Sequence, residues 1–195
     1  MADEKKSMIF IDASNLLGGW WTYCKGNGFI SIDNKTNRQI LSKKIDYQKL
    51  ISEIAKNTDF IRGYFYNSVD EPVDSKKQGF FDKLRSLEVT IVTKKLRHKI
   101  VKCKHCQKED FNVPYQKGVD VALVTEFMSL ATEKAYEIGI VVSGDNDFVD
   151  AINYVKSKGI KVWVASFANC LGEDAMRAVD KVIQLDKLIN NICMA

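Results

Sequence analysis

The sequence predicts an α/β protein whose mainly parallel sheet is covered by helices on both faces. Short apolar runs of strand length alternate with longer segments of helical periodicity, and only two prolines interrupt the 195 residues. The strand-length runs are apolar at almost every position, as in strands that are buried on both faces. Because 46% of the residues are hydrophobic, the chain can bury one substantial core, and we expect one domain over residues 1–195.

The expected elements follow one another in a regular order. Strands are predicted at 8–11, 60–66, 89–92, 138–143 and 160–165. Helices are predicted at 15–24, 46–57, 75–87, 117–131 and 147–159. In the fourth helix, the spacing suggests one apolar side made of Val121, Val124, Met128 and Ala131. Trp20, Trp21 and Tyr23 of the first helix are interpreted as packing residues.

Two segments interrupt this alternation. Residues 26–45 are polar and contain glycine, which predicts an inserted loop or small hairpin. Residues 94–116 are basic and replace the short connection expected between a strand and a helix. Loops of this length are often functional, so the second insertion is a candidate binding element.

The net charge and the cysteine content indicate the cellular environment and the partners of the protein. A net charge of +4 is compatible with a polyanionic partner but does not demonstrate one. Five cysteines at scattered spacing do not form the framework of a small secreted domain, and Cys24, Cys170 and Cys193 are interpreted as buried thiols. The first residues contain too short an apolar run for a signal peptide, and no later run approaches a membrane span. We therefore expect a cytoplasmic protein that does not interact with membranes.

Four aspartates are expected at one edge of the sheet. Asp12 ends the first strand, Asp145 and Asp147 follow the fourth, and Asp120 opens a helix. In parallel sheets, ligands bind beyond the carboxyl ends of the strands, so these side chains should lie together. Each aspartate by itself has a structural explanation, because Asp residues favour turns and helix starts. Together they would repel one another unless a cation joins them.

A hard divalent cation would resolve that repulsion. Mg²⁺ and Mn²⁺ prefer oxygen ligands and leave coordination positions for water and phosphate. Such a site can activate water and neutralise charge on a phosphate group, with one or two ions. The sequence therefore predicts phosphodiester hydrolysis that depends on Mg²⁺ or Mn²⁺.

Three blocks of this sequence resemble the signature blocks of the NYN domain, specifically its LabA-like branch. They are IDASNL at 11–16, KGVDVALVTEF at 117–127 and SGDNDF at 143–148, and the resemblance extends from about Met8 to about Leu185. The family belongs to the PIN-like nucleases. The resemblance implies a three-layer α/β/α sandwich and metal-dependent endoribonuclease chemistry.

Site roles follow from the resemblance position by position. It assigns Asp12, Asp120, Asp145 and Asp147 to catalysis and metal binding. It assigns supporting roles to Asn15, Lys117, Ser143 and Glu126, although at Glu126 the family more usually carries an aspartate. A homodimer is a further expectation, by analogy with the fold.

The second insertion carries a dense group of basic residues. These are Lys94, Lys95, Arg97, Lys99, Lys102, Lys104 and Lys108, with no acidic residue among them. A charge run of this kind is usually a solvated surface. Beside an acidic metal site, however, it would hold a phosphate backbone within reach, so we favour RNA docking, on single-stranded or structured RNA.

The same insertion contains Cys103 and Cys106 at the spacing of half a zinc site. A structural zinc needs four ligands, and the nearby candidates are His98 and His105. His105 stands between the two cysteines, where simultaneous ligation is awkward, so His98 is the preferred third ligand. Incomplete coordination and sharing across a dimer both remain open.

Rival functions were weighed on the same residues. A haloacid-dehalogenase-type phosphatase requires an aspartate where Ser14 stands, and a receiver domain requires one after the strand at 89–92. A metal-dependent adhesion module of Asp-x-Ser-x-Ser type matches at Asp12 and Ser14 but departs at Leu16. A non-catalytic, regulatory RNA-binding protein with the same acidic residues remains the main alternative.

Overall fold

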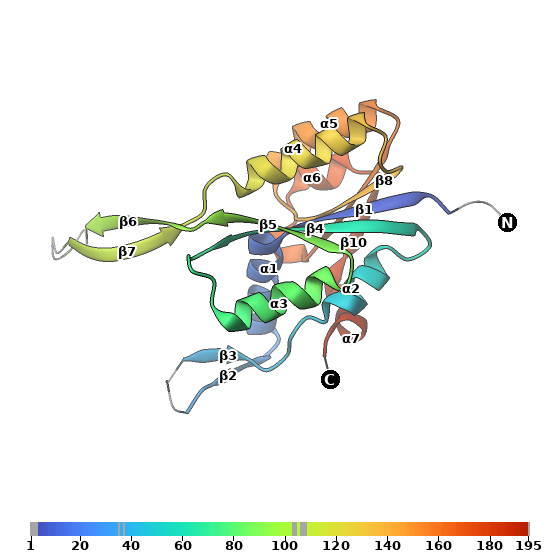
Figure 1. Cartoon of the computed structure of the whole chain (residues 1–195). Helices are drawn as coiled ribbons and strands as arrows, with labels where there is room; N and C mark the ends of the chain where they lie inside the picture. Colours follow the sequence, from blue (N-terminus) through green and yellow to red (C-terminus); the bar gives the residue numbers. More distant parts are fainter. Residues whose placement is uncertain (1–3, 35, 37, 103–104, 106–108, 195) are drawn as a thin grey trace.

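A six-stranded parallel sheet runs through the centre of the protein (Figure 1). The computed structural model describes residues 4–34, 36, 38–102, 105 and 109–194. In sheet order the strands are β10 (Lys181–Gln184), β9 (Lys161–Ser166), β8 (Ile138–Val142), β1 (Lys6–Asp12), β4 (Asp59–Val69) and β5 (Val89–Lys95). All neighbouring pairs are parallel, which confirms the predicted sheet.

Helices cover both faces of the sheet and complete a three-layer α/β/α sandwich, as predicted (Figure 1). One layer holds α1 (Ala13–Gly26), α2 (Tyr47–Ile54), α3 (Ser75–Arg85) and the short α7 (Ile189–Ile192). The other layer holds α4 (Val119–Thr132), α5 (Val149–Ser157) and α6 (Glu173–Ala178). This division arises because each crossover between parallel strands must return over one face of the sheet.

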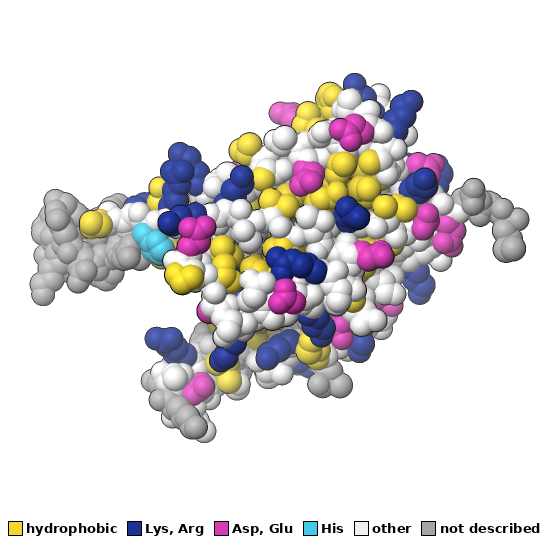
Figure 2. All heavy atoms as spheres, in the orientation of Figure 1, with side chains coloured by type: hydrophobic (Ala, Val, Ile, Leu, Met, Phe, Trp, Pro, Cys, Tyr) yellow, Lys and Arg dark blue, Asp and Glu magenta, His cyan; other side chains and the backbone are white. Residues whose placement is uncertain are grey.

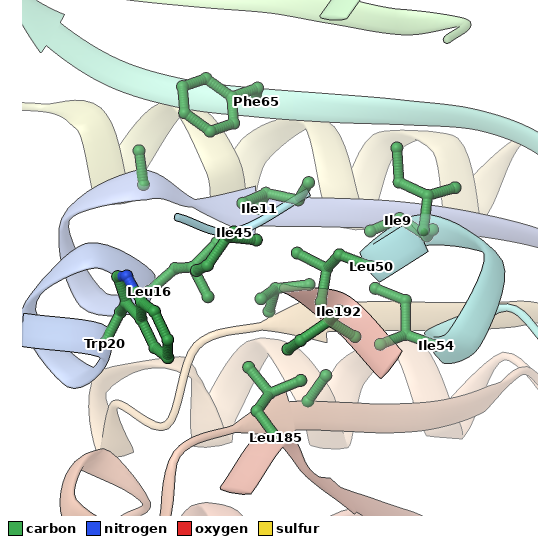
Figure 3. Close-up of a cluster of buried hydrophobic side chains, with 14 of the residues drawn as sticks. Ile9, Ile11, Leu16, Trp20, Ile45, Leu50, Ile54, Phe65, Leu185 and Ile192 are labelled. Atoms are coloured by element: carbon green, nitrogen blue, oxygen red, sulfur yellow. The ribbon is translucent and has the colours of Figure 1, made fainter. Parts of the chain in front are cut away.

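Each face of the sheet has its own hydrophobic core. In β1, Ile9 and Ile11 point into the core on the α1 side, where Figure 3 shows them with Leu16, Trp20 and other buried side chains. Phe10 points to the opposite face, where its ring stacks on Tyr64 at a centroid distance of 5.4 Å. This alternation follows from the two-residue period of a strand. It also places Asp12 on the same face as Phe10, towards α4.

The order of the strands creates a switch point at the end of β1. From β1 the chain continues to β4 and β5 on one side, whereas β8, β9 and β10 occupy the other side. The connections leaving β1 and β8 therefore diverge, and a crevice is expected between the carboxyl ends of these two strands. Asp12 ends β1, and Ser143 directly follows β8.

Both insertions are antiparallel hairpins. The polar segment contains β2 (Ile30–Ile32) and β3 (Gln39–Leu41), so the small hairpin was the correct alternative. The basic segment contains β6 (Arg97–Lys102) and β7 (Glu109–Tyr115), whereas a long loop had been expected. Figure 1 shows this second hairpin extending away from the sheet. Its strands pair with each other, which supplies backbone hydrogen bonds without help from the main sheet.

Three details differ from the prediction. Val121 is 68% exposed, and α4 instead buries Val119, Leu123, Phe127 and Ala131, because the apolar residues of this helix surround much of its circumference. Trp20 is buried at 1% exposure, but its neighbour Trp21 is 36% exposed. Cys24 and Cys193 are buried as expected, while Cys170 is only partly so. No helix in the described ranges has the length and apolar character that crossing a membrane requires.

Candidate active site

Asp12 is held at the junction of β1 and α1. Its Oδ1 atom accepts hydrogen bonds from the backbone N of Ser14 at 3.1 Å, from the Ser14 Oγ at 2.8 Å and from the backbone N of Asn15 at 3.2 Å. Asp12 is therefore the N-cap of α1, the structural role considered from the sequence. The side chain is only 4% exposed. Within the described residues, its Oδ2 atom accepts one hydrogen bond, a long one of 3.3 Å from Ser143 Oγ. Oδ2 thus keeps lone-pair capacity facing the crevice.

The loop after β8 is tied to the start of α1. Asn15 Oδ1 accepts a hydrogen bond from the backbone N of Gly144 at 3.1 Å. Gly144 packs so closely on the turn at Ala168–Cys170 that an added Cβ would collide with the carbonyl oxygen of Cys170. A side chain at this position would push the loop away from Asp12. Asn15 thus joins the start of α1 to the loop that follows Ser143.

Asp145 and Asp147 stand just beyond that loop. The backbone N of Asp145 donates to Ser143 Oγ at 3.4 Å, and the backbone N of Asp147 donates to Asp145 Oδ1 at 3.0 Å. Asp145 is therefore also the N-cap of the short 3-10 helix Asn146–Phe148. Both carboxylates are exposed at the carboxyl edge of the sheet. They remain accessible to a ligand from solvent.

Asp120 approaches from the opposite layer, in the first turn of α4. The preceding Gly118 has a positive φ of 78°, which lets the chain turn sharply from the hairpin into the helix. Burial raises the pKa of Asp120, and repulsion from Asp12, Asp145 and Asp147 raises it further. The direction of this shift is the one that nearby negative charges produce.

The donor chemistry of these residues suits a hard cation. Carboxylate oxygens are the ligands that Mg²⁺ and Mn²⁺ prefer, and the mutual repulsion recorded at Asp120 is what a cation would relieve. Within the described residues, no three side chains of the His, Cys, Asp and Glu types are arranged to hold an ion by themselves. Mg²⁺ is commonly held by one or two carboxylates, with water and phosphate completing its shell. The donor set therefore fits such a partly hydrated ion.

A basic groove begins beside these acids. It has a volume of 810 Å³, runs along α4, and is lined by Lys94, Arg97, Lys117 and Glu126 among others. Figure 2 shows Lys and Arg side chains gathered where the β6–β7 hairpin leaves the sheet. Since Lys117 and Gly118 directly precede the first turn of α4, the groove and the carboxylates meet at the N-terminus of this helix.

The remaining predicted basic residues fall into three groups. Lys95 Nζ lies 3.3 Å from Glu71 Oε2, so it is engaged in an ion pair outside the groove. Lys99 Nζ lies 5.7 Å from the ring centroid of Tyr115 within the hairpin. Lys104, Lys108 and the side chain of Lys102 lie outside the described residues.

Of the three predicted zinc ligands, His98 lies within the described residues. Cys103 and Cys106 lie outside the described residues. His98 belongs to β6, and its Nε2 atom lies 3.6 Å from Asp70 Oδ1. This contact gives His98 a partner of its own at the base of the hairpin.

Sequence reasoning missed three residues of this region. Tyr66, paired with Asp12 across β1 and β4, donates from its hydroxyl to Glu126 Oε2 at 2.9 Å. Asn146 Oδ1 accepts from the backbone N of Ala175 at 3.1 Å and so anchors α6 to the loop after β8. Ser68 Oγ is a buried oxygen without a hydrogen-bond partner in the described chain, on the same face of β4 as Tyr66. The contacts of Tyr66 and Asn146 are visible only in three dimensions, because they join segments that are far apart in the chain. Asn146 lies inside the SGDNDF block, but that block does not indicate its contact with α6.

Glu126 and Leu16 also clarify the sequence-based alternatives. Glu126 contacts Tyr66 and lines the groove. Leu16 is 2% exposed and packs in the core, so it cannot replace the second serine of an adhesion-type metal site.

Comparisons with known proteins agree with this arrangement. The family model of the NYN domain matches residues 6–186. The LabA protein of Synechococcus elongatus, described as "Low amplitude and bright protein", is 25% identical over 130 residues, which is 67% of this chain and 65% of LabA. A Vibrio parahaemolyticus protein of unknown function has the same fold, with a TM-score of 0.66, 16% sequence identity and coverage of 100% of this chain and 99% of that chain.

The family match covers nearly the whole sheet and all four aspartates. NYN domains are related to the PIN-like nucleases, so the comparison supports nuclease ancestry at a coarse level. The likeness to LabA supports the branch that the three sequence blocks indicated. This chain therefore belongs to the NYN domain family, in its LabA-like branch.

Proposed function

We propose that this protein is an endoribonuclease that hydrolyses RNA phosphodiester bonds with Mg²⁺ or Mn²⁺. The observation that carries the proposal is the joining of Asp12 and Asp145 through Ser143 at the switch point between β1 and β8, with Asp120 near enough that, in addition to burial, the charges of the other aspartates raise its pKa. The adjoining basic groove supplies a surface for the substrate's phosphates. Family membership supports nuclease chemistry independently of this geometry.

The carboxylates would have distinct tasks. Asp12 Oδ2 and Asp145 would be the principal ligands, because Asp12 is fixed by its cap and Asp145 is fixed through Ser143. Asp120 and Asp147 would hold water molecules that complete the shell. A bound divalent ion would supply Lewis-acid stabilisation of the phosphate and lower the pKa of the attacking water.

Other residues would position the substrate. Lys94, Arg97 and Lys117 would contact backbone phosphates along α4. Asn15 and Ser143 would keep Asp12 and the loop after β8 in register through their hydrogen bonds. Glu126 would remain on the wall of the groove, hydrogen-bonded to Tyr66.

The test is cleavage of a labelled, mixed-sequence single-stranded RNA with Mn²⁺, with Mg²⁺ and with EDTA. The native protein is compared with Asp145→Asn and with the control Asp150→Asn, which alters an exposed aspartate in the first turn of α5. Products that require a divalent ion, are lost in Asp145→Asn and persist in Asp150→Asn are expected. Equal cleavage by all three proteins, or cleavage in EDTA, would contradict the proposal.

One observation favours a second candidate, a regulatory protein that binds RNA without cutting it. Asp12 and Asp145 both cap helical turns, so these two aspartates have structural value even without a metal. In that case RNA would bind in the groove with no products in any metal, and Asp145→Asn would leave the affinity for RNA unchanged. The same cleavage assay, run beside an RNA-binding titration, separates the two functions.

A further inference from the structure

An apolar cavity that is partly open to solvent lies on the face of the sheet away from the aspartates. Its volume is 280 Å³, and its walls come from all three longer helices of that layer. Trp20 belongs to α1, Tyr47 to α2, and Phe80 and Leu84 to α3, with Leu41 of β3 completing the wall. Such a cavity is near the lower end of the size range of small-molecule sites.

Two hydrogen-bond donors lie on the wall of this cavity. They are the Trp20 indole N–H and the Tyr47 hydroxyl, and burial raises the pKa of Tyr47. Neither is a buried group left without a partner, because Ser68 Oγ is the one such side-chain atom in the described residues. A ligand oxygen in the cavity can accept a hydrogen bond from either donor.

The charges around the cavity all have one sign. Lys44 and Lys83 are exposed and line it from opposite elements, and no acidic residue is part of the lining. Across the described residues, neither lysine forms an ion pair. An occupant with an apolar body and one negative charge would therefore match both the wall and the rim.

We propose that this cavity binds a small amphipathic anion, a straight-chain carboxylate of medium length. The alkyl chain would lie against Trp20, Phe80 and Leu84, and the carboxylate would accept hydrogen bonds from Lys44 and Lys83. The volume of 280 Å³ favours a small molecule over a helix or strand of a protein partner, which would require a longer groove. This site is separate from the carboxylates at the end of β1 and does not depend on the ribonuclease proposal.

The first experiment is a calorimetric titration of the whole protein with octanoate, hexanoate and octanol. Octanoate should bind saturably, and hexanoate, which is two methylenes shorter, should bind about 15-fold more weakly, because each buried methylene contributes about fourfold in affinity. Octanol, which has the same chain without the charge, should also bind more weakly than octanoate. Absence of saturable octanoate binding, or equal affinity for all three, overturns the proposal.

Variants then locate the binding site. The double variant Lys44→Gln/Lys83→Gln should lower octanoate affinity by about tenfold and leave octanol affinity unchanged. The control Lys56→Gln removes an exposed lysine that is not part of the cavity and should change neither. Leu17→Trp, at a 44% exposed position on the lining, should fill the entrance and weaken both ligands without disturbing the core.

Two controls make a negative result decisive. Thermal unfolding of each variant establishes that it is folded, and sedimentation establishes whether the native chain is monomeric. If the chain is a dimer that excludes octanoate, the cavity is an interface between copies and the proposal is wrong. If octanoate binds equally to native protein and Leu17→Trp, the ligand lies elsewhere and the proposal is also wrong.

Discussion

Ser143 Oγ donates a hydrogen bond to Asp12 Oδ2 at 3.3 Å, although the two residues are 131 positions apart in the chain. The contact joins the ends of β1 and β8, the strands that flank the switch point. Ser143 Oγ also accepts a bond from the backbone N of Asp145 at 3.4 Å. One hydroxyl therefore links the carboxylate of Asp12 to the backbone of Asp145, and these two residues are the proposed principal metal ligands.

Replacing this hydroxyl should weaken metal binding more than it weakens the fold. Both of its hydrogen bonds are long, so Ser143→Ala should cost at most about 1 kcal/mol of unfolding free energy. Loss of a group that orients metal ligands typically lowers metal affinity by about 10- to 100-fold. Mn²⁺ titration and denaturant unfolding measure the two effects. The control Ser7→Ala removes a buried hydroxyl at the other end of β1, hydrogen-bonded to Thr58, and should leave Mn²⁺ affinity unchanged; an equal loss in both variants would refute the linkage.

Lys94 and Lys95 offer a matched pair for the RNA groove. They are neighbours in β5 and so point to opposite faces, Lys94 into the groove and Lys95 to Glu71. Lys94→Ala should weaken binding of single-stranded RNA and make its salt dependence shallower by about 0.7 in log–log slope, the value for one lost phosphate contact. Lys95→Ala should change the slope little. The RNA affinity of both variants is measured across a salt series. A larger loss of affinity in Lys95→Ala than in Lys94→Ala would exclude RNA from this groove.

Asp120 should destabilise the metal-free protein at neutral pH. The pKa of this carboxyl is raised above its ordinary value of 3.8, so the folded state binds the proton more tightly and loses stability as pH rises through the raised pKa. Asp120→Asn removes the repulsion but also a favourable charge at a helix N-terminus, and Asp150→Asn removes only the latter.

In EDTA at neutral pH, Asp120→Asn should therefore unfold at a higher temperature than Asp150→Asn, by about 1–3 °C. Addition of Mn²⁺ should reduce or reverse this difference in melting temperature. The reason is that Asp150→Asn keeps all four aspartates of the proposed metal site and is therefore stabilised more by the ion. Thermal unfolding with and without Mn²⁺ measures both effects. A lower melting temperature for Asp120→Asn in EDTA would mean that the four aspartates do not repel one another as described.

The contribution of Asp180 to stability should depend on pH in the opposite sense to that of Asp120. Burial by itself would raise the pKa of Asp180. The hydrogen bond from the backbone N of Val162 at 2.8 Å and the ion pair with Lys156 at 3.1 Å outweigh burial, so the pKa is lowered. The stability it contributes is present above the ordinary value of 3.8 and is lost as pH falls through the lower folded-state pKa. Asp180→Asn should cost about 1 kcal/mol at neutral pH and progressively less below pH 3.8. Urea unfolding of the native protein and Asp180→Asn over this pH range measures the loss of unfolding free energy. A loss that does not change with pH would show that the charge of Asp180 is not involved.

The sequence by itself determined the fold class and the identity of the clustered acids. Continuous apolar runs of strand length and apolar residues at helical spacing are local features of the sequence, so the parallel sheet and the helices could be predicted from them. Asp12 and Asp145 could be placed at one edge because carboxyl ends of parallel strands share an edge. The face of α4 could not be predicted from its spacing, since Val121 is as apolar as the buried Leu123 and only packing against β1 and β4 selects between them.

Tertiary structure alone decided which groups touch. The bond between Ser143 and Asp12, the contact of Tyr66 with Glu126 and the anchoring of α6 by Asn146 all join segments far apart in the chain. Lys94 and Lys95 have the same chemistry in sequence, and strand alternation gives one a groove and the other an acidic partner. Residues of three helices and a hairpin strand line the apolar cavity, so it cannot be recognised in any single segment of the sequence. Local periodicity sets the elements, whereas distances between side chains exist only after the sheet order brings those elements together.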